Sequence, residues 1–387
     1  MNYKNLIILG AGTMGKGLLR IGKRQLTTFD TITIIDVNRL DGNYLDYYRN
    51  INFQTGDAED LDLLTFLVKP LSGRVLVVNL CSGVDSVRIR KHLGKLGTAY
   101  LDTSAGLLPD RTQDTFIDLM KYTHTRVDSP CPQWICWGMN PGLVEIVARK
   151  MLMDSHERDG NFHVTIYEHD NLNVVTKSGK LGVGWSPSDL IGEFMLTPTF
   201  EVRDDRPVQD DIKCAKPATV RWGGDTVASR IVAHEDIWNL GLIPQVSSAR
   251  FAYALHPSIM EVLSSPVDRA YERLGVPEDD VPLRGKDRVA VQLISDNNER
   301  QCLVWETDHA RVWGQYGVNA VQFQVCRGIQ VALDLFQRTS LGLLKGTYCP
   351  STLPLTQREF DFIERSFAIS DIEWLSCTSP DLRILDV

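Results

Sequence analysis

Apolar and polar residues alternate along the first 140 residues between a pattern typical of buried strands and a pattern typical of helices. The apolar run at 6–9 predicts a strand buried on both faces of a parallel sheet, and further strands are predicted at 31–36, 51–53, 75–80 and 98–103. The segments between these strands have helical patterns, except 41–50, which is predicted as a short helix or loop. Strands that alternate with helices predict an α/β fold with a doubly wound parallel sheet of the Rossmann type.

The regular alternation of strands and helices ends near residue 163, although strand patterns continue. The further predicted strands, of which the last two form a hairpin, lie at 163–168, 219–222, 230–234, 250–256, 288–295 and 301–307. This arrangement is typical of a second, α+β domain with a mixed sheet. A short helix is also predicted at 188–195.

Beyond residue 317, apolar residues recur at near-helical spacing, at Val321, Val325, Ile329, Ala332 and Phe336. They predict a long helix that returns to the first domain. A chain of 387 residues is long enough for two domains. We therefore expect a first domain at 1–142, a second domain at 143–317, and C-terminal helices at 318–387 that return to the first domain.

A glycine-rich turn follows the first predicted strand directly. Gly10 permits a tight turn, Gly12 lets a pyrophosphate approach the backbone, and Gly15 lets the next helix pack closely on the strand. Thr13 and Met14 open that helix, whose N-terminus offers unpaired N–H groups and a positive dipole end to phosphates. A glycine triplet is a weak signal alone, but its place between a strand and a helix predicts dinucleotide binding. The alternative is a glycine-rich turn without a ligand.

Asp36 ends the second predicted strand, about 20 residues after the glycines. Its carboxylate can accept hydrogen bonds from a ribose 2′-hydroxyl and would repel a 2′-phosphate, so the sequence favours NAD over NADP. The carboxyl ends of the later strands face the same crevice in such a sheet. The candidate cofactor-binding residues at those ends are Asn79, Leu80, Asp102 and Thr103.

Asn140 and Pro141 precede a helix predicted from about 142 to 154. Pro141 suits the first turn of a helix, while the residue before a proline favours an extended conformation. The Asn140 side chain would therefore point into the cleft that the helix N-terminus faces. The alternative is that Asn140 is only an N-cap.

Charge and composition exclude several classes of partner. The chain has 41 basic and 49 acidic side chains, a net charge of −8, and no basic run suited to a phosphate backbone, so nucleic acid is not expected as a partner. Apolar runs such as 75–78 are far too short to span a bilayer, and no signal peptide is recognised, which favours a cytoplasmic protein without membrane contact. The eight cysteines lack metal-ligand spacing, so no metal site is expected.

These motifs together resemble bacterial homospermidine synthase, a member of the saccharopine-dehydrogenase-like group of NAD(P)-dependent enzymes. The resemblance runs in the same order through most of the chain, roughly residues 5–375. The segments that carry it are 10–17, Asn79-Leu80, Tyr100-Leu101-Asp102-Thr103, Gly138-Met139-Asn140-Pro141-Gly142-Leu143-Val144, 166–170, 253–257 and the helix around 324–335. The Asn-Pro-Gly motif is the most specific of them.

The resemblance implies chemistry in which bound NAD is both oxidant and reductant. A primary amine becomes an imine, a second amine attacks it, ammonia leaves, and the new imine is reduced. The substrate would be a small-molecule amine, and the second domain would form a homodimer. By the same resemblance, Asn140 would orient substrate or nicotinamide, Glu168 would bind the reacting ammonium or shuttle its proton, and His256 would be a second relay. Each also has a structural alternative: a cap, a solvated carboxylate and a structural histidine.

The chain departs from the family pattern at positions that would bind a cationic amine. Gly106 stands where the family has a glutamate for the distal amine. A hand alignment places Val175 and Val183 where the family has a tryptophan and a following carboxylate, although Trp185 lies nearby and offers a cation–π surface. Loss of these groups would disfavour a doubly charged diamine. The fold and cofactor therefore carry over better than the substrate.

Two alternatives to a homospermidine-synthase-like enzyme stay open. An opine- or saccharopine-type dehydrogenase would join a keto acid or aldehyde to an amine and would need cations for a carboxylate. The candidates are Lys177, Arg221 and Arg250, each of which also suits a surface charge. A third possibility is an NAD-binding relative without catalytic activity. Trp185 and Lys177 are the candidate substrate-binding residues.

Overall fold

The chain folds into two compact units. The computed structural model describes residues 3–39, 48, 50–109, 115–155, 160–222, 225–368, 375–376 and 383–386, so most of 41–50, predicted as a short helix or loop, lies outside the described residues. Unit 1 comprises Met1–Asp114, Asp118–Leu143 and Gln324–Ser366. Unit 2 comprises Thr115–Ile117, Val144–Phe323 and Phe367–Val387. The last segment therefore differs from the prediction that all of 318–387 returns to the first domain, because its strands pair with the sheet of unit 2.

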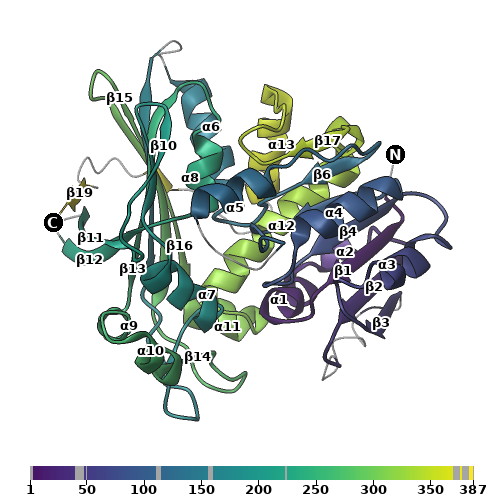
Figure 1. Ribbon diagram of the computed structural model, residues 1–387, viewed down its shortest axis with the longest axis horizontal. Coiled ribbons are helices and arrows are strands. Elements are labelled where there is room, and N and C mark those ends of the chain that lie inside the picture. Colours follow the sequence, from purple (N-terminus) through teal and green to yellow (C-terminus); the bar gives the residue numbers. More distant parts are fainter. Residues whose placement is uncertain are drawn as a thin grey trace. The chain divides into compact units, whose positions relative to one another are not determined.

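Unit 1 is built on a seven-stranded sheet in the order β17-β6-β5-β4-β1-β2-β3 (Figure 1). All neighbouring strands pair in parallel, which confirms the Rossmann-type fold. The strands are β1 (Asn5–Leu9), β2 (Thr31–Asp36), β3 (Ile51–Thr55), β4 (Val75–Asn79), β5 (Ala99–Asp102), β6 (Pro132–Trp134) and β17 (Gly346–Tyr348).

The helices of unit 1 connect these strands and cover them. They are α1 (Thr13–Ile21), α2 (Lys23–Leu26), α3 (Leu61–Val68), α4 (Ser86–Lys95), most of α5 (Phe116–Thr123), the larger part of α12 (Ala320–Arg338), a 3₁₀ turn at Ser340–Leu343, and α13 (Gln357–Ala368). Leu64 of α3 and Leu93 of α4 pack on Val77 and Tyr100 in one core cluster. The predicted long C-terminal helix is α12, whose Gln330 donates from Nε2 to the carbonyl of Ile21.

Unit 2 is built on a mixed ten-stranded sheet. Its main path runs β18-β16-β15-β7-β13-β12-β11-β19, and β9 and β10 extend from β13 (Figure 1). The strands are β7 (Phe162–Asp170), β9 (Phe200–Arg203), β10 (Arg206–Gln209), β11 (Lys216–Trp222), β12 (Asp225–Val232), β13 (Val246–Leu255), β15 (Lys286–Ser295), β16 (Arg300–Asp308), β18 (Leu375–Ser376) and β19 (Arg383–Asp386). The mixed-sheet second domain is thus confirmed.

Short helices and a two-stranded sheet complete unit 2. They are α6 (Leu143–Asp154), β8 (Leu181–Gly182), α7 (Pro187–Ile191), a π-helix η2 (Gly192–Leu196), α8 (Glu235–Leu240), α9 (Pro257–Val262), α10 (Val267–Arg273), β14 (Leu274–Gly275) and α11 (His309–Tyr316). The predicted strand at 230–234 ends earlier, at Val232, because His234 is the N-cap of α8.

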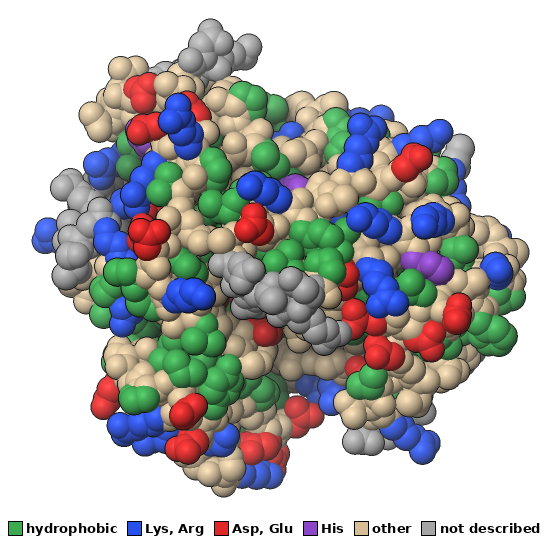
Figure 2. All heavy atoms as spheres, viewed as in Figure 1, with side chains coloured by type: hydrophobic (Ala, Val, Ile, Leu, Met, Phe, Trp, Pro, Cys, Tyr) green, Lys and Arg blue, Asp and Glu red, His purple; other side chains and the backbone are tan. Residues whose placement is uncertain are grey.

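Charged side chains of both signs are interspersed on the face of the molecule shown in Figure 2. Within the described residues, every helix is too short or too polar to cross a membrane.

Candidate dinucleotide and substrate sites

The glycine turn of unit 1 has the geometry of a dinucleotide-binding loop. Gly10 has a positive φ of +93°, and a Cβ on Gly15 would lie 2.2 Å from the Gly10 carbonyl oxygen. A Cβ on Gly12 would meet no atom within 4 Å. The three glycines therefore provide a tight turn, close helix packing and open space for a pyrophosphate, as predicted. Helix α1 begins at Thr13, and Gly12 caps it without a side-chain hydrogen bond, which leaves the N–H groups of the first turn to a ligand.

The Asp36 carboxylate is fixed beside this loop. Its Oδ2 accepts from the backbone N–H of Ala11 at 2.7 Å, and its Oδ1 accepts from that of Asn38 at 2.8 Å. Each carboxylate oxygen can accept a further hydrogen bond, so both ribose hydroxyls have an acceptor here. The negative charge disfavours a 2′-phosphate at the same position.

Replacing Asp36 with alanine is expected to weaken NAD binding by roughly tenfold or more, because charge-assisted hydrogen bonds to the ribose are lost. The preference for NAD over NADP should fall at the same time. Titration calorimetry of the purified protein with NAD and with NADP measures both the NAD affinity and the preference. Asp30→Ala is a matched control, since Asp30 precedes β2 at the opposite end of the strand and its side chain is 66% exposed. Unchanged NAD affinity in Asp36→Ala would contradict the assignment.

Asn79 and Asp102 end β4 and β5, as predicted, but both side chains are almost fully buried. Asn79 donates from Nδ2 to the Tyr100 hydroxyl at 2.9 Å and accepts from the N–H of Cys81. Asp102 accepts at Oδ1 from the N–H of Cys136 at 2.8 Å. These contacts fix the loops that follow the two strands.

Leu80 donates its N–H to the carbonyl of Leu9, at the end of the strand that leads into the glycine turn. Thr103 follows Asp102 and is partly exposed. A direct cofactor contact from Leu80, Thr103, Asn79 or Asp102 stays a prediction.

The segment around Asn140 forms a closed turn before α6. Gly142 has a φ of +137°, and a Cβ on it would lie 2.2 Å from the Gly138 carbonyl oxygen. Gly138 donates its N–H to the Pro141 carbonyl, and its own carbonyl accepts from Leu143. The helix therefore begins at Leu143, and the prediction that Pro141 lies in its first turn is wrong. Asn140 is partly exposed, and its catalytic role, like a cofactor contact from Pro141, stays a prediction.

Unit 2 holds a group of carboxyls on one face of its sheet, which we call the acidic cluster: Glu168, Asp170, Glu193 and Asp287. In the strand register Glu168 pairs with Tyr253 on β13, and Asp170 lies opposite Asp287 on β15. Side chains two residues apart on a strand share a face, so Glu168, Asp170 and Asp287 project to the same side. Glu168 is 4% exposed and Asp170 is 1% exposed.

Asp170 is held by hydrogen bonds to two other parts of unit 2. The Nδ1 of His309 accepts from the backbone N–H of Ala320, so its proton lies on Nε2, which contacts Asp170 Oδ1 at 2.9 Å. The same oxygen accepts from the N–H of Leu172. These two donors fix the position of the Asp170 carboxyl.

Glu193 joins the cluster from the π-helix η2. The residue is partly exposed, yet its Oε1 is buried and makes no hydrogen bond to the described residues. Burial raises the pKa of Glu193 to about 8; the charge of His234 opposes this rise, and the carboxylates of Glu235, Glu168 and Asp236 add to it. Glu193 is therefore mainly a neutral acid at pH 7.

Trp185 contacts Tyr253, whose side chain faces the acidic cluster. The Trp185 indole donates from Nε1 to the Tyr253 hydroxyl at 3.3 Å. Burial, followed by the charges of Glu168 and Asp170, raises the pKa of Tyr253 well above its usual range. The structure therefore brings together Glu168 and Trp185, which were both predicted as site residues.

The other predicted residues of unit 2 have identifiable local contacts. His256 is the N-cap of α9, where its Nδ1 accepts from the N–H of Ser258, and its own N–H donates to the Asp170 carbonyl. Lys177 is exposed and forms an ion pair with Asp280 at 2.5 Å. Arg221 is exposed on β11, and Arg250 is partly exposed on β13. The proposed catalytic and substrate-binding roles of these four residues stay predictions.

Gly106 has no room for a side chain. A glutamate, which the family resemblance would place here, does not fit this backbone. A Cβ would lie 2.5 Å from Ser86 Oγ and 2.5 Å from the Val84 carbonyl oxygen. A carboxylate at this position would require the backbone to shift.

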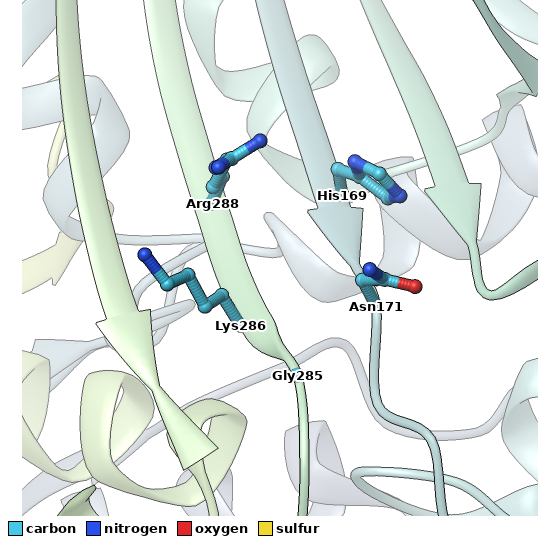
Figure 3. Close-up of a pocket in the computed structure, with 5 residues that line it drawn as sticks. All are labelled: His169, Asn171, Gly285, Lys286 and Arg288. Atoms are coloured by element: carbon cyan, nitrogen blue, oxygen red, sulfur yellow. The ribbon is translucent and has the colours of Figure 1, made fainter.

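The opposite face of the unit 2 sheet carries a separate cavity of about 260 Å³. Figure 3 shows its lining residues, with His169 and Arg288 on neighbouring strands, Asn171 after β7, and Gly285 and Lys286 where β15 begins. Burial and the charge of Arg288 lower the pKa of His169. Because His169 and Arg288 alternate with Glu168 and Asp287 along their strands, this cavity lies across the sheet from the acidic cluster.

Sequence reasoning missed Glu193, Asp287 and His309 as site residues. Asp287 stands two positions before Val289 and four before Val291. This alternation could have placed it on a buried face of the predicted strand. Among the described residues, no group of three or more His, Cys, Asp or Glu side chains is arranged to hold a metal ion.

Comparisons with known proteins agree with the architecture of unit 1. Residues 6–128 match the model of the saccharopine dehydrogenase NADP-binding domain. Together with the loop geometry, this match shows that unit 1 is an NAD(P)-binding domain of the dehydrogenase class. More particularly, the matching segment is similar to the NADP-binding domain of saccharopine dehydrogenase. No curated protein sequence matches the chain.

Two solved structures share the fold. Homospermidine synthase from Legionella pneumophila, crystallised with NAD, has 15% sequence identity and a TM-score of 0.72, covering 99% of this chain and 90% of that one. Apo saccharopine dehydrogenase (L-Glu forming) from Saccharomyces cerevisiae has 12% identity and a TM-score of 0.60, covering 97% and 99%. At such identities the likeness shows a shared fold and no more.

Proposed function

We propose that this protein is an NAD-dependent oxidoreductase and aminoalkyl transferase that acts on a C–N bond of an amine, similar to homospermidine synthase. The observation that carries the proposal is the acidic cluster of unit 2, in a chain whose unit 1 is an NAD(P)-binding domain. Asp36 supports NAD rather than NADP as the cofactor.

The chemistry of the acidic cluster suits a cationic amine. Carboxylates bind ammonium groups through charge-assisted hydrogen bonds, which strengthen when water is excluded. Glu168 and Asp170 are almost fully buried, and the Trp185 indole beside Tyr253 offers a ring face for a cation.

The positions of Trp185 and Glu193 suggest a different alignment with the family's tryptophan and carboxylate, which the hand alignment places at Val175 and Val183. They are eight residues apart, the same spacing as Val175 and Val183 in the hand alignment. Val175 is 55% exposed and Val183 is buried, whereas Glu193 belongs to the acidic cluster and Trp185 contacts Tyr253 beside it. We propose that Trp185 and Glu193 are the counterparts of the family's tryptophan and carboxylate, so a diamine such as putrescine is the first substrate to test.

Bound NAD supplies hydride acceptance and donation, so the overall exchange of amine for ammonia is redox-neutral. Glu168 holds the ammonium group of the substrate and takes its proton, which frees the nitrogen lone pair for imine formation. Trp185 and Glu193 bind the second nitrogen and orient the chain of the diamine. Burial of the cluster excludes water, which limits hydrolysis of the imine.

The experiment is a mass-spectrometric assay of the purified protein with putrescine and no added NADH. The proposal predicts a condensed polyamine and ammonia, with no net change in NAD. Consumption of added NADH only when a keto acid and an amine are both present would favour an opine- or saccharopine-type dehydrogenase. The fold shared with saccharopine dehydrogenase makes this the second candidate. Bound NAD without turnover of any amine would indicate an inactive relative.

Glu193→Gln is expected to remove a pH dependence of diamine binding. The carboxyl of Glu193 ionises as pH rises through about 8, so the KM for putrescine in the wild type should fall between about pH 7 and pH 9. A glutamine stays neutral, so the KM of the Glu193→Gln variant for putrescine should not fall over this pH range. Steady-state kinetics across the pH range measures both. Glu272→Gln, on the exposed face of α10, is the matched control and should behave as the wild type. An identical pH profile in Glu193→Gln would contradict the role.

A further inference from the structure

Asp287 is the most completely buried member of the acidic cluster. It is 0% exposed, and neither carboxyl oxygen makes a hydrogen bond of normal geometry to the described residues. Asp170 lies directly opposite it on β7, and Glu168 lies opposite Val289, one step further along the same face. Directly opposite residues of antiparallel strands have Cβ atoms only about 5 Å apart, so two ionised carboxylates would repel here.

The charged groups around Asp287 do not compensate a negative charge on it. Glu168 and Asp170 face it from β7, and Tyr253 faces the same cluster from β13. The Nε2 proton of His309 on α11 is directed to Asp170. The cations next to Asp287 in sequence, Lys286 and Arg288, project from the other face (Figure 3) and pair there with Glu306 at 2.6 and 2.5 Å.

An unpaired carboxylate buried in this way would be strongly unfavourable, so the carboxyl keeps its proton instead. Burial, then the charges of Glu168 and Asp170, raises the pKa of Asp287 well above its usual range; the N–H of Arg288 opposes this only weakly. The protonated Asp287 thus adds no negative charge next to Glu168 and Asp170.

We propose that Asp287 is a proton-storing positioning residue, neutral in the free protein and ionised, with release of its proton to solvent, when an ammonium group binds beside Glu168. The inference rests on the proposed function for the nature of the ligand. The ligand enters and stays as R–NH₃⁺ in this step, and the Asp287 O–H bond breaks to give a carboxylate and one proton in solution. The charge of the site therefore follows the charge of its ligand.

The free protein tests the first half of this proposal. The infrared difference spectrum of wild type minus Asp287→Asn at neutral pH should show the C=O band of one buried carboxylic acid. The band of the neutral Glu193 carboxyl is common to both proteins and cancels. The variant should also be more stable than the wild type at about pH 8, with the difference vanishing near pH 4. In the wild type the unfolded chain ionises above its ordinary pKa while the folded chain keeps its proton, so stability falls as pH rises. Absence of this band from the difference spectrum would overturn the proposal.

Titration calorimetry with putrescine in two buffers of different ionisation enthalpy tests the second half. Wild type should release about one proton more on binding than Asp287→Asn. Glu306→Gln is the matched control, because Glu306 lies on the adjacent strand and its partners project from the opposite face; it should retain the wild-type proton release. Binding with equal proton release in wild type and Asp287→Asn would contradict this inference alone. Failure of putrescine to bind any of the three proteins would contradict the proposed function, and with it the ligand on which the inference depends.

Discussion

Replacing Gly12 with valine is expected to abolish dinucleotide binding while the fold of unit 1 stays intact. Gly12 has a φ of −69°, which any residue adopts, and a Cβ there would meet no protein atom within 4 Å. The added side chain would instead occupy the space through which a pyrophosphate reaches the N–H groups of α1. Calorimetry should show NAD affinity lower by at least about 100-fold, equivalent to about 2.7 kcal/mol. The melting temperature without cofactor should match that of the wild type.

Two further glycines make this prediction specific. Gly15→Ala should lower the melting temperature itself, because its Cβ would lie 2.2 Å from the Gly10 carbonyl oxygen. Gly314→Ala on the exposed side of α11 should change neither stability nor NAD binding by much, since its Cβ also meets open space. If Gly12→Val bound NAD as well as the wild type, the glycine turn would not be the pyrophosphate site.

Glu168→Gln is expected to reduce amine turnover by at least about 100-fold while NAD binding in unit 1 is unchanged. Glutamine has nearly the same shape as glutamate but can neither take a proton from an ammonium group nor offset its charge. Glu168 is 4% exposed, so water replaces neither function. Turnover of putrescine under saturating NAD, with dinucleotide affinity measured in parallel, provides the test.

His169→Gln is the matched control for Glu168→Gln. His169 is the next residue of β7, but its side chain lines the cavity on the opposite face of the sheet. If turnover depends on the acidic cluster, this variant should keep most of its activity. Equal losses in Glu168→Gln and His169→Gln would mean that damage to β7, rather than removal of a carboxylate, explains the effect.

The fold and the glycine turn were predictable because their signals are local. The roles of Gly10, Gly12 and Gly15 follow from a strand, a turn and a helix that are contiguous in sequence. Six strands of unit 2, namely β7, β11, β12, β13, β15 and β16, were recognised in the same way, from the pattern within each segment, whereas β9, β10, β18 and β19 were not predicted.

The acidic cluster was less predictable because strand pairing between distant segments creates it. Asp170 and Asp287 are separated by more than a hundred residues, and only the antiparallel register of β7 and β15 makes them neighbours. Glu193 lies on a π-helix, where helical periodicity does not indicate which side chains face inward. The helix start at Leu143 was missed because the positive φ of Gly142 depends on its close approach to Gly138.

The most direct test of the account is a single-turnover experiment with putrescine deuterated at the carbons next to nitrogen. The purified protein is loaded with NAD, mixed with the labelled amine and quenched, and the dinucleotide is analysed by mass spectrometry. Wild type should show deuterium in the reduced dinucleotide. Gly12→Val, which is expected not to retain NAD, should show none, and Glu168→Gln should show no more than a trace. A polyamine product formed without any label in the dinucleotide would contradict hydride transfer from the amine to NAD.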